Sequence, residues 1–200
     1  KLLAENGLTE ADVSKIIASG MITCEFGLCN LPHLTLPAGK EELREGLHTE
    51  LFPEMSSVPF TFVRGVKCSD GTPDNTDMVR GEETEILGLY RGEGVYILAG
   101  SHTKLMWADE SGKITDIKTL LTGELISAVS GNTILKDAVD LSVGEFSKEY
   151  LIKGYNYAAE NGMGDALFKV RVLKNLFNNT PAEVYSFFMG AILSDDVSAV

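Results

Sequence analysis

The pattern of apolar and polar positions changes along the chain, from short strand-like runs to longer segments with helical spacing. Short runs rich in β-branched and aromatic residues predict strands at 15–19, 60–66, 94–99, 105–108 and 113–118. Helical spacing predicts helices at 39–47, 81–89, 125–130, 143–160, 165–175 and 181–193. The pattern therefore predicts a mixed α/β chain, with strands first and most helices after.

Local signals refine these elements. The run 15–19 is apolar enough for a buried strand. Thr180-Pro181 is typical of a helix start, with a cap residue followed by proline at the first helical position. Residues 94–118 predict an antiparallel meander of three strands joined by two tight turns. The polar, turn-rich stretch 68–77 is a candidate lobe boundary or substrate-facing loop.

Composition and charge narrow the function classes. The chain has 200 residues, of which 44% are hydrophobic, enough for a core without disulfides or metals. Its net charge of -12 argues against nucleic-acid and anionic-membrane partners, which need a basic face. A few positive groups at a turn or helix end can still hold an anionic substrate. The sequence shows no bilayer-length apolar run and no signal-peptide pattern.

The cysteines and histidines give no metal-binding pattern in the sequence. The cysteines are odd in number and lack metal-ligand spacing, so we expect reduced thiols in a cytoplasmic protein. The histidines are too scattered to predict a metal cluster with them. These residues are Cys24, Cys29, Cys68, His33, His48 and His102.

The turn Gly100-Ser101-His102-Thr103-Lys104 is the strongest candidate for an anion site. A tight turn aims successive backbone N–H groups at one point, and Ser101 and Thr103 add hydroxyl donors. Lys104 and His102 add positive charge, so the segment is suited to phosphate oxygens. An ordinary polar hairpin turn uses the same small residues, and the motif alone leaves both interpretations open.

A second candidate is Arg80-Gly81-Glu82-Glu83-Thr84, at the start of a predicted helix. The exposed N–H groups and the helix dipole favour ionised carboxylates there. Such a carboxylate can accept a proton from a substrate hydroxyl or help to hold Mg²⁺, and Arg80 could contact an anionic substrate. Simple complementation of the helix dipole explains the same pattern.

Two further segments are weaker candidates. Thr122-Gly123-Glu124 starts another predicted helix and by composition is no more than a capping sequence. The loop Gly20-Met21-Ile22-Thr23 follows a strand, and it either lines a pocket or only connects two elements.

Together, these segments resemble the 2-keto-3-deoxygalactonate kinase family. The resemblance rests on four motifs in a fixed order: Ser19-Gly20-Met21-Ile22-Thr23, Met78 to Gly88, Gly100-Ser101-His102-Thr103-Lys104 and Leu120-Leu121-Thr122-Gly123-Glu124-Leu125. Arg-Gly-Glu-Glu-Thr followed by Gly-Ser-His-x-Lys is specific to that family. The resemblance covers nearly the whole chain.

The resemblance implies an actin-like ATPase fold, in which two ribonuclease-H-like lobes clamp ATP and sugar. Residues 1–80 would be the remainder of the first lobe. Residues 81–200 would form the second lobe, which begins with a helix and the antiparallel meander. The family's Asp-x-Gly-Ser/Thr phosphate hairpin and its glycine-containing adenosine segment have no counterpart in this sequence, so we expect a chain incomplete at both ends.

The resemblance also implies a reaction: ATP-dependent phosphorylation of a 2-keto-3-deoxy sugar acid, expected to convert 2-dehydro-3-deoxy-D-galactonate to its 6-phosphate. Glu82 stands where the broader class of sugar kinases has a general-base aspartate, and Glu83 competes for that role. The turn Gly100 to Lys104 would bind phosphate, with Mg²⁺ arriving on ATP rather than held by the protein. Arg80, the Gly20–Thr23 loop and Thr122–Glu124 would contact the substrate.

Two other function classes stay open. One is a kinase of the same fold that acts on another sugar or sugar acid, and the other is a non-catalytic actin-like nucleotide-binding module. The expected partners are a small sugar acid and a nucleotide, with neither nucleic acid nor membrane. A homodimer is common in such kinases, and the expected location is the cytoplasm.

Overall fold

The computed structural model describes residues 1–200, and its internal contacts group them into two compact units. Unit 1 comprises Lys1–Tyr96 and Leu105–Lys118, and unit 2 comprises Ile97–Lys104 and Thr119–Val200. These limits differ from the expected lobe boundary at residue 80, and the two-lobe assignment stays a prediction.

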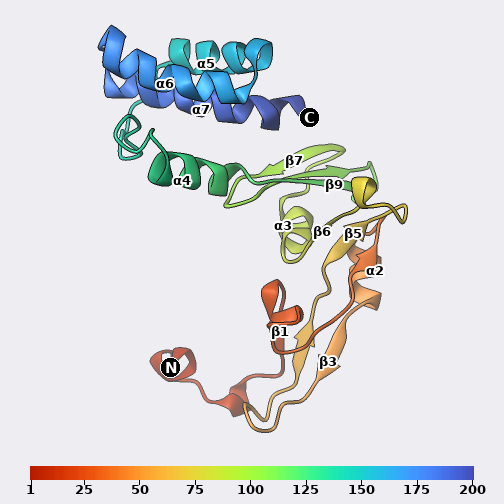
Figure 1. Ribbon diagram of the computed structural model, residues 1–200. Coiled ribbons are helices and arrows are strands. Elements are labelled where there is room, and N and C mark those ends of the chain that lie inside the picture. The colour runs from red at the N-terminus through yellow and green to blue at the C-terminus, as the bar shows by residue number, and fades with distance from the viewer. The chain divides into compact units, whose positions relative to one another are not determined.

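Three neighbouring strands carry the chain into unit 2 after Tyr96, back into unit 1 after Lys104 and into unit 2 again after Lys118. They are β7 (Gly94–Leu98), β8 (Thr103–Ala108) and β9 (Ile114–Leu120), which neighbour one another in chain order. This order confirms the predicted succession of three strands, which are labelled in part in Figure 1.

The first small sheet of unit 1 has β4 (Phe60–Phe62) at its centre. One neighbour is the parallel strand β1 (Ile16–Ala18), and the other is the antiparallel strand β3 (His48–Glu50). Ile16 and Ala18 of β1 pack against the core of this sheet, whereas Ile17 points to the opposite face and is 66% exposed, so the strand at 15–19 is not buried as predicted.

The second small sheet of unit 1 has β5 (Val66–Cys68) at its centre, between the parallel strand β2 (Leu34–Thr35) and the antiparallel strand β6 (Asp77–Val79). The single strand predicted at 60–66 is therefore wrong. The chain leaves one sheet after Phe62 and enters the other at Val66, so the run is divided between two sets of partners.

The polar stretch 68–77 is the loop of the β5–β6 hairpin and lies within unit 1. The Asp70 carboxylate accepts hydrogen bonds from the Thr72 backbone N–H (2.9 Å), the Thr72 hydroxyl (2.6 Å) and the Asn75 amide (2.6 Å). These donors lower the pKa of Asp70 to about 2. The loop is therefore ordered by its own side chains and is not the boundary between the two units.

The remaining elements of unit 1 are short helices. The α-helices are α1 (Leu2–Glu5), α2 (Lys40–Glu45) and α3 (Glu82–Leu89), and the 3₁₀ turns are η1 (Glu10–Asp12), η2 (Met21–Thr23) and η3 (Pro73–Asn75). Phe52 contacts Phe60 and Phe62 edge-on, with ring centroids 5.6 and 6.1 Å away. Together with Leu31 these rings form a core beside the first sheet.

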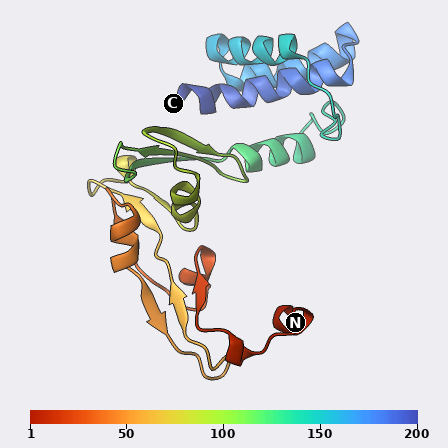
Figure 2. The ribbon, with the colours of Figure 1, turned by 180° about the vertical axis from the view of Figure 1, so that it is seen from behind.

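Unit 2 is mainly helical. Its helices are α4 (Thr122–Asn132), α5 (Lys148–Asn161), α6 (Met163–Phe177) and α7 (Pro181–Ser198). Figures 1 and 2 both show α5, α6 and α7, drawn in blue shades, side by side. Phe187 and Phe188 of α7 lie in the core between them. None of the chain's helices is both long and apolar enough to cross a membrane.

Two predicted helix starts in unit 2 have different outcomes. The Thr180-Pro181 start is confirmed, because the Thr180 hydroxyl accepts a hydrogen bond from the Glu183 N–H at the beginning of α7. The helix predicted at 143–160 begins later, since Ser147 is the N-cap of α5 and its hydroxyl accepts from the Tyr150 N–H. Residues 143–147 are not helical.

Helices α5 and α7 approach so closely that glycine is required at their crossing. A Cβ atom at Gly190 would overlap the Leu151 carbonyl oxygen, and one at Gly154 would overlap the Phe187 carbonyl oxygen. The backbones therefore pack directly against each other, as small residues permit at close helix crossings.

We expect Gly190→Ala to lower the free energy of unfolding by about 1–3 kcal/mol, because the added methyl group forces α5 and α7 apart. Gly164→Ala in α6 is the matched control, since a Cβ there meets nothing within 4 Å, and alanine should stabilise that helix by up to about 1 kcal/mol. Urea unfolding followed by circular dichroism measures both. Equal effects of the two substitutions would contradict the direct backbone contact.

Candidate functional site

In unit 1, the start of α3 lies against the loop that follows β1. Gly81, the residue before the helix, has φ of +118°, a conformation that residues with a side chain rarely adopt. A Cβ atom at Gly81 would also lie 3.3 Å from the Cα of Gly20. The two glycines therefore let the Arg80–Thr84 motif and the Gly20–Thr23 loop meet backbone to backbone.

Arg80 fastens this contact with its guanidinium group. Its Nη1 donates to the Thr23 carbonyl oxygen (2.5 Å) and to the Thr23 hydroxyl (2.7 Å). Its Nη2 donates to the Leu31 carbonyl oxygen (3.1 Å) and lies 3.3 Å from His33 Nδ1. Both terminal nitrogens are thus occupied inside unit 1, although we expected Arg80 to contact a substrate. The geometry instead favours a role in positioning the motif.

His33 also lies beside the Arg80 guanidinium. No pattern in the sequence predicted this contact. Burial, followed by the positive charges of Arg80 and Lys67, lowers the pKa of His33 below its usual value. The imidazole is therefore neutral at pH 7, and its Nδ1 can accept a hydrogen bond from Arg80.

The two glutamates at the start of α3 differ in environment. Glu82 is partly exposed, and its Oε2 accepts a hydrogen bond from the Arg80 backbone N–H at 3.0 Å. Glu83 is fully buried, and its Oε2 accepts from the Gly81 N–H at 2.7 Å. Its other oxygen, Oε1, is buried without a hydrogen-bond partner. Only Glu82 therefore has solvent access for a substrate.

Burial raises the pKa of Glu83 to about 7, against the opposing effect of its backbone hydrogen bonds. The neighbouring Glu82 raises it further. The unpartnered Oε1 is consistent with a neutral carboxyl, because leaving a charged oxygen buried without a donor costs more than leaving a neutral one.

The Gly20–Thr23 loop forms the 3₁₀ turn η2, and its residues divide into two groups. Thr23 is fully buried, and its hydroxyl donates to the Gly20 carbonyl oxygen at 3.0 Å while accepting from Arg80. Met21 is 66% exposed. Of the predicted substrate contacts in this loop, Met21 is accessible and Thr23 is committed to internal bonds.

In unit 2, the predicted phosphate-binding turn is shorter than expected. Thr103 and Lys104 belong to β8, and they are only 5% and 7% exposed, because this strand is buried along most of its length. Gly100 and Ser101 are exposed and His102 is half-buried, so the accessible part of the turn is Gly100 to His102.

The start of α4 lies directly behind this turn. A Cβ atom at Gly123 would overlap the Gly100 carbonyl oxygen, so only glycine allows the approach. The Glu124 N–H donates to the Ser101 carbonyl oxygen at 3.0 Å, and His102 Nε2 lies 2.9 Å from Glu124 Oε1. Two segments that the sequence singled out separately are thus brought together within unit 2.

Thr122 links the same helix start to α7. Its hydroxyl lies 2.8 Å from both carboxylate oxygens of Asp196, and the Thr122 side chain is buried. We expected Thr122 to contact a substrate, but its hydroxyl donates to Asp196. No sequence signal marked Asp196, because it is distant in the chain and stands in an ordinary helical segment.

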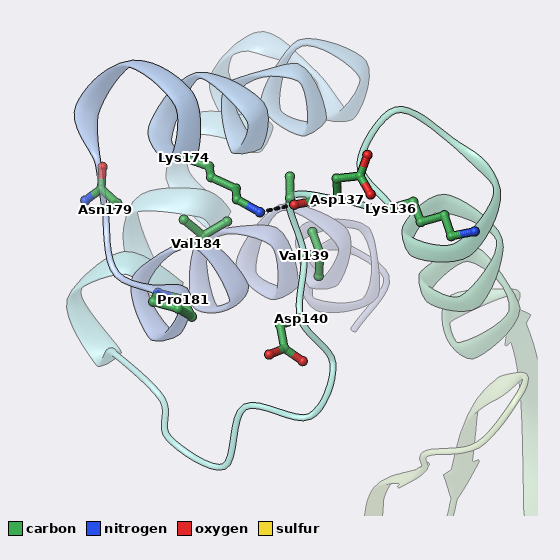
Figure 3. Close-up of a pocket in the computed structure, with 9 residues that line it drawn as sticks. Lys136, Asp137, Val139, Asp140, Lys174, Asn179, Pro181 and Val184 are labelled. Atoms are coloured by element: carbon green, nitrogen blue, oxygen red, sulfur yellow. Dashed lines mark hydrogen bonds between the residues drawn. The ribbon is translucent and has the colours of Figure 1, made fainter.

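Unit 2 also contains a pocket of about 350 Å³ that the sequence did not predict. Figure 3 shows the Lys174 side chain reaching toward the backbone of Asp137, where Lys174 Nζ donates to the carbonyl oxygen. The lining residues are Lys136, Asp137, Ala138, Val139, Asp140, Lys174, Asn179, Pro181 and Val184. None of the predicted site residues lines this pocket.

The structure brings a cysteine and a histidine together, although their scattered positions in the sequence did not suggest a metal cluster. The three cysteines are free thiols, but Cys29, His48 and Glu50 place ligand atoms within 4.8 Å of one another. Cys29 comes from the loop after η2, and His48 and Glu50 come from β3. Their distance along the chain gives no sign that these side chains meet.

Comparison with known proteins places the chain in a family. A family model described as 2-keto-3-deoxy-galactonokinase matches residues 2–200. The chain belongs to this family. The motifs around Gly20, Arg80, Gly100 and Thr122 all fall inside the matched range, as the resemblance implied.

Two individual proteins are similar to this galactonokinase-family chain. The 2-dehydro-3-deoxygalactonokinase of Escherichia coli (strain K12) is 25% identical over 192 residues, which cover 92% of this chain and 61% of that protein. A crystal structure from Sinorhizobium meliloti, provisionally named 2-dehydro-3-deoxygalactonokinase, matches with a TM-score of 0.82 at 22% identity. That match covers 99% of this chain and 65% of the other, and it establishes a shared α/β fold. The chain thus spans less than two thirds of either relative.

For this galactonokinase-family chain, we expect the stability conferred by Glu83 to fall as pH rises. The folded pKa of about 7 lies above the unfolded value of 4.5, so the folded state retains a proton between these values. The contribution is complete below pH 4.5 and decreases by up to roughly 3 kcal/mol as pH rises to about 7. Glu83→Gln should lack this decrease. Urea unfolding of both proteins from pH 4.5 to 8 tests it, and parallel curves would contradict it.

We also expect Arg80→Met to lower the free energy of unfolding by about 2–4 kcal/mol, because it removes the donors for Thr23 and Leu31 and leaves buried acceptors unpaired. Arg44→Met is the matched control, since the Arg44–Glu41 pair on α2 is exposed and should change stability little. Thermal unfolding monitored by circular dichroism compares them. Equal losses would show that Arg80 is not a structural anchor.

Proposed function

We propose that this chain forms part of an ATP-dependent kinase that phosphorylates the 6-hydroxyl of 2-dehydro-3-deoxy-D-galactonate. The observation that carries the proposal is the galactonokinase-family match over residues 2–200. The two candidate motifs, at the start of α3 and at the Gly100 turn, are both fixed by hydrogen bonds to neighbouring segments. The name of the E. coli relative supports the same substrate. The proposal includes the two-lobed actin-like ATPase fold, with residues 1–80 and 81–200 in different lobes, and a cytoplasmic enzyme that forms a homodimer.

Glu82 is the proposed general base. Its carboxylate is partly exposed, lies at the start of α3, and accepts a hydrogen bond from the Arg80 backbone N–H, which holds it in place. An ionised carboxylate fixed in this way can take the proton of the substrate hydroxyl. Glu83 is buried and pairs with the Gly81 N–H, so we propose that it fixes the turn before the helix.

Gly100, Ser101 and His102 form the proposed phosphate-binding turn. The turn is exposed, and its backbone is supported from behind by the Glu124 N–H and by the close approach of Gly123. Thr103 and Lys104 would act from the adjoining buried strand, where the positive charge of Lys104 contributes to the local field. Phosphoryl transfer needs mainly positioning and charge stabilisation. The backbone N–H groups and side chains of Gly100 to Lys104 are of the types that provide both.

Mg²⁺ enters this proposal as part of the nucleotide substrate. Bound to ATP, it neutralises charge on the phosphates. Because Glu82 is the proposed base, the phosphate oxygens of the nucleotide would carry the ion in this proposal. Around the ion, this chain's own groups would orient the acceptor hydroxyl and exclude water.

A coupled ADP-release assay on the full-length protein with Mg-ATP tests the function. We expect turnover with 2-dehydro-3-deoxy-D-galactonate and much less with its gluconate epimer, because one hydroxyl configuration distinguishes them. Turnover with another sugar acid alone would change the substrate and keep the reaction class. Nucleotide binding without turnover on any sugar acid would favour the non-catalytic nucleotide-binding module.

We expect Glu82→Gln to lower kcat by about 10²–10⁴-fold with little change in stability, because it removes a base without emptying a buried site. Glu83→Gln is the matched control: it keeps an acceptor for the Gly81 N–H and should retain much more activity. Steady-state kinetics of the folded variants compare them. A reversed order, with Glu83→Gln the more damaged enzyme, would move the base to Glu83.

A further inference from the structure

Three side chains with different metal-ligand atoms converge in unit 1, near the Gly20–Thr23 loop. Cys29 lies in the loop between η2 and β2, and His48 and Glu50 lie on β3. The Cys29 Sγ is 3.4 Å from Glu50 Oε2, and His48 Nε2 is 3.2 Å from the same oxygen. All three ligand atoms lie within 4.8 Å of one another.

These separations match the edges of a tetrahedral zinc site. With Zn–S of about 2.3 Å, Zn–N of about 2.05 Å and Zn–O of about 2.0 Å, tetrahedral angles require S···O of about 3.5 Å and N···O of about 3.3 Å. The observed separations are 3.4 and 3.2 Å. A cation could therefore bind between these atoms with only small side-chain movements.

The backbone holds the ligands in place. His48 and Glu50 are two residues apart on one strand, so their side chains point to the same face, and β3 is paired in register with β4 through His48–Phe62 and Glu50–Phe60. Cys29 packs against the core of Leu31, Phe60 and Phe62, and its N–H donates to the Ile22 carbonyl oxygen at 3.2 Å. Preorganised ligands reduce the ordering cost of binding.

The ligand set also selects the metal. One thiolate, one imidazole and one carboxylate suit Zn²⁺, which accepts sulfur, nitrogen and oxygen ligands together, whereas Mg²⁺ and Ca²⁺ prefer oxygen alone. The thiolate and the carboxylate would balance the two charges of the ion. His48 and Glu50 are 38% and 46% exposed, so water can occupy a fourth position and the ion can enter from solvent.

We propose that Cys29, His48 and Glu50 form a zinc-binding site in which Zn²⁺ has three protein ligands and one water. On binding, the Cys29 thiol releases its proton to solvent, and the sulfur, His48 Nε2 and a Glu50 oxygen each donate an electron pair to the ion. No change of oxidation state is involved.

The bound ion would clamp the loop that carries Cys29 to β3. The two ends of this loop, at Thr23 and Leu31, supply the carbonyl oxygens that Arg80 binds. The Leu31 N–H also donates to the Thr23 carbonyl oxygen at 3.1 Å and closes the loop. Zinc would therefore stabilise the support of the α3 start without contacting Glu82 or Glu83.

Cobalt titration of the full-length, tag-free protein tests the site. We expect one equivalent of Co²⁺ to produce a thiolate-to-cobalt charge-transfer band and intense d–d bands of tetrahedral coordination, and Zn²⁺ to remove both. Cys29→Ser should abolish the charge-transfer band and weaken binding by more than about 10-fold, since loss of an outer-shell partner alone costs about 10–100-fold. Cys68→Ser is the matched control, since the Cys68 thiol donates to the carbonyl oxygens of Asp77 and Ile117, is not part of the Cys29 cluster, and should leave the bands unchanged.

Thermal unfolding adds a readout that does not depend on cysteine. Zn²⁺ should raise the Tm of the wild-type protein and of Cys68→Ser, but not of His48→Ala or Glu50→Gln. The latter two variants also serve if Cys29→Ser does not fold. An absent charge-transfer band, or equal cation binding by wild type and Cys29→Ser, would overturn the proposal and leave only the hydrogen-bonded triad.

Discussion

The hydrogen bonds of the Arg80 guanidinium are the interaction on which the candidate site of unit 1 depends. They join a motif at the start of α3 to carbonyl oxygens that are more than forty residues away in the chain. A planar group with several fixed donors suits this task, because it satisfies several buried acceptors from one point. Without it, the Gly20–Thr23 loop would lose the side-chain hydrogen bonds that join it to the motif at the start of α3.

In unit 2, backbone contacts rather than an arginine side chain fix the candidate site. Its turn at Gly100–His102 is supported by the backbone of α4, because Gly123 allows the helix start to touch the turn. Thr122 then ties that helix start to Asp196 of α7. In both units a glycine permits close approach and a polar side chain secures it. This arrangement holds the partly exposed Glu82 and the turn at Gly100–His102 in fixed positions.

Local sequence signals predicted much of the secondary structure and the positions of the motifs. The helix starts at Gly81 and Thr180 follow from capping chemistry, which acts over a few residues. Errors appeared wherever a neighbour distant in the chain decides the outcome. The run 60–66 is divided because β4 and β5 pair in different sheets, and Ile17 is exposed because only the opposite face of β1 packs against a core.

The candidate site shows the same limit. The sequence could propose Arg80, Glu82 and the turn at Gly100, but not that His33 and Asp196 complete their surroundings. Nor could it show that Glu83 is buried while Glu82 is accessible, because adjacent residues on a helix face different directions. The meeting of Cys29 with His48 likewise depends on tertiary structure and leaves no spacing pattern.

The crossing of α5 and α7 has a consequence for how this sequence can change over time. Two carbonyl oxygens occupy the space that a methyl group would need at Gly154 and Gly190, so neither position can pass through alanine while the crossing is kept. Drift elsewhere on the two helices can be absorbed by side-chain repacking. At these two positions it cannot, because backbone atoms are covalently fixed in the helices. The pair should therefore remain glycine in descendants whose remaining helix surface has diverged widely.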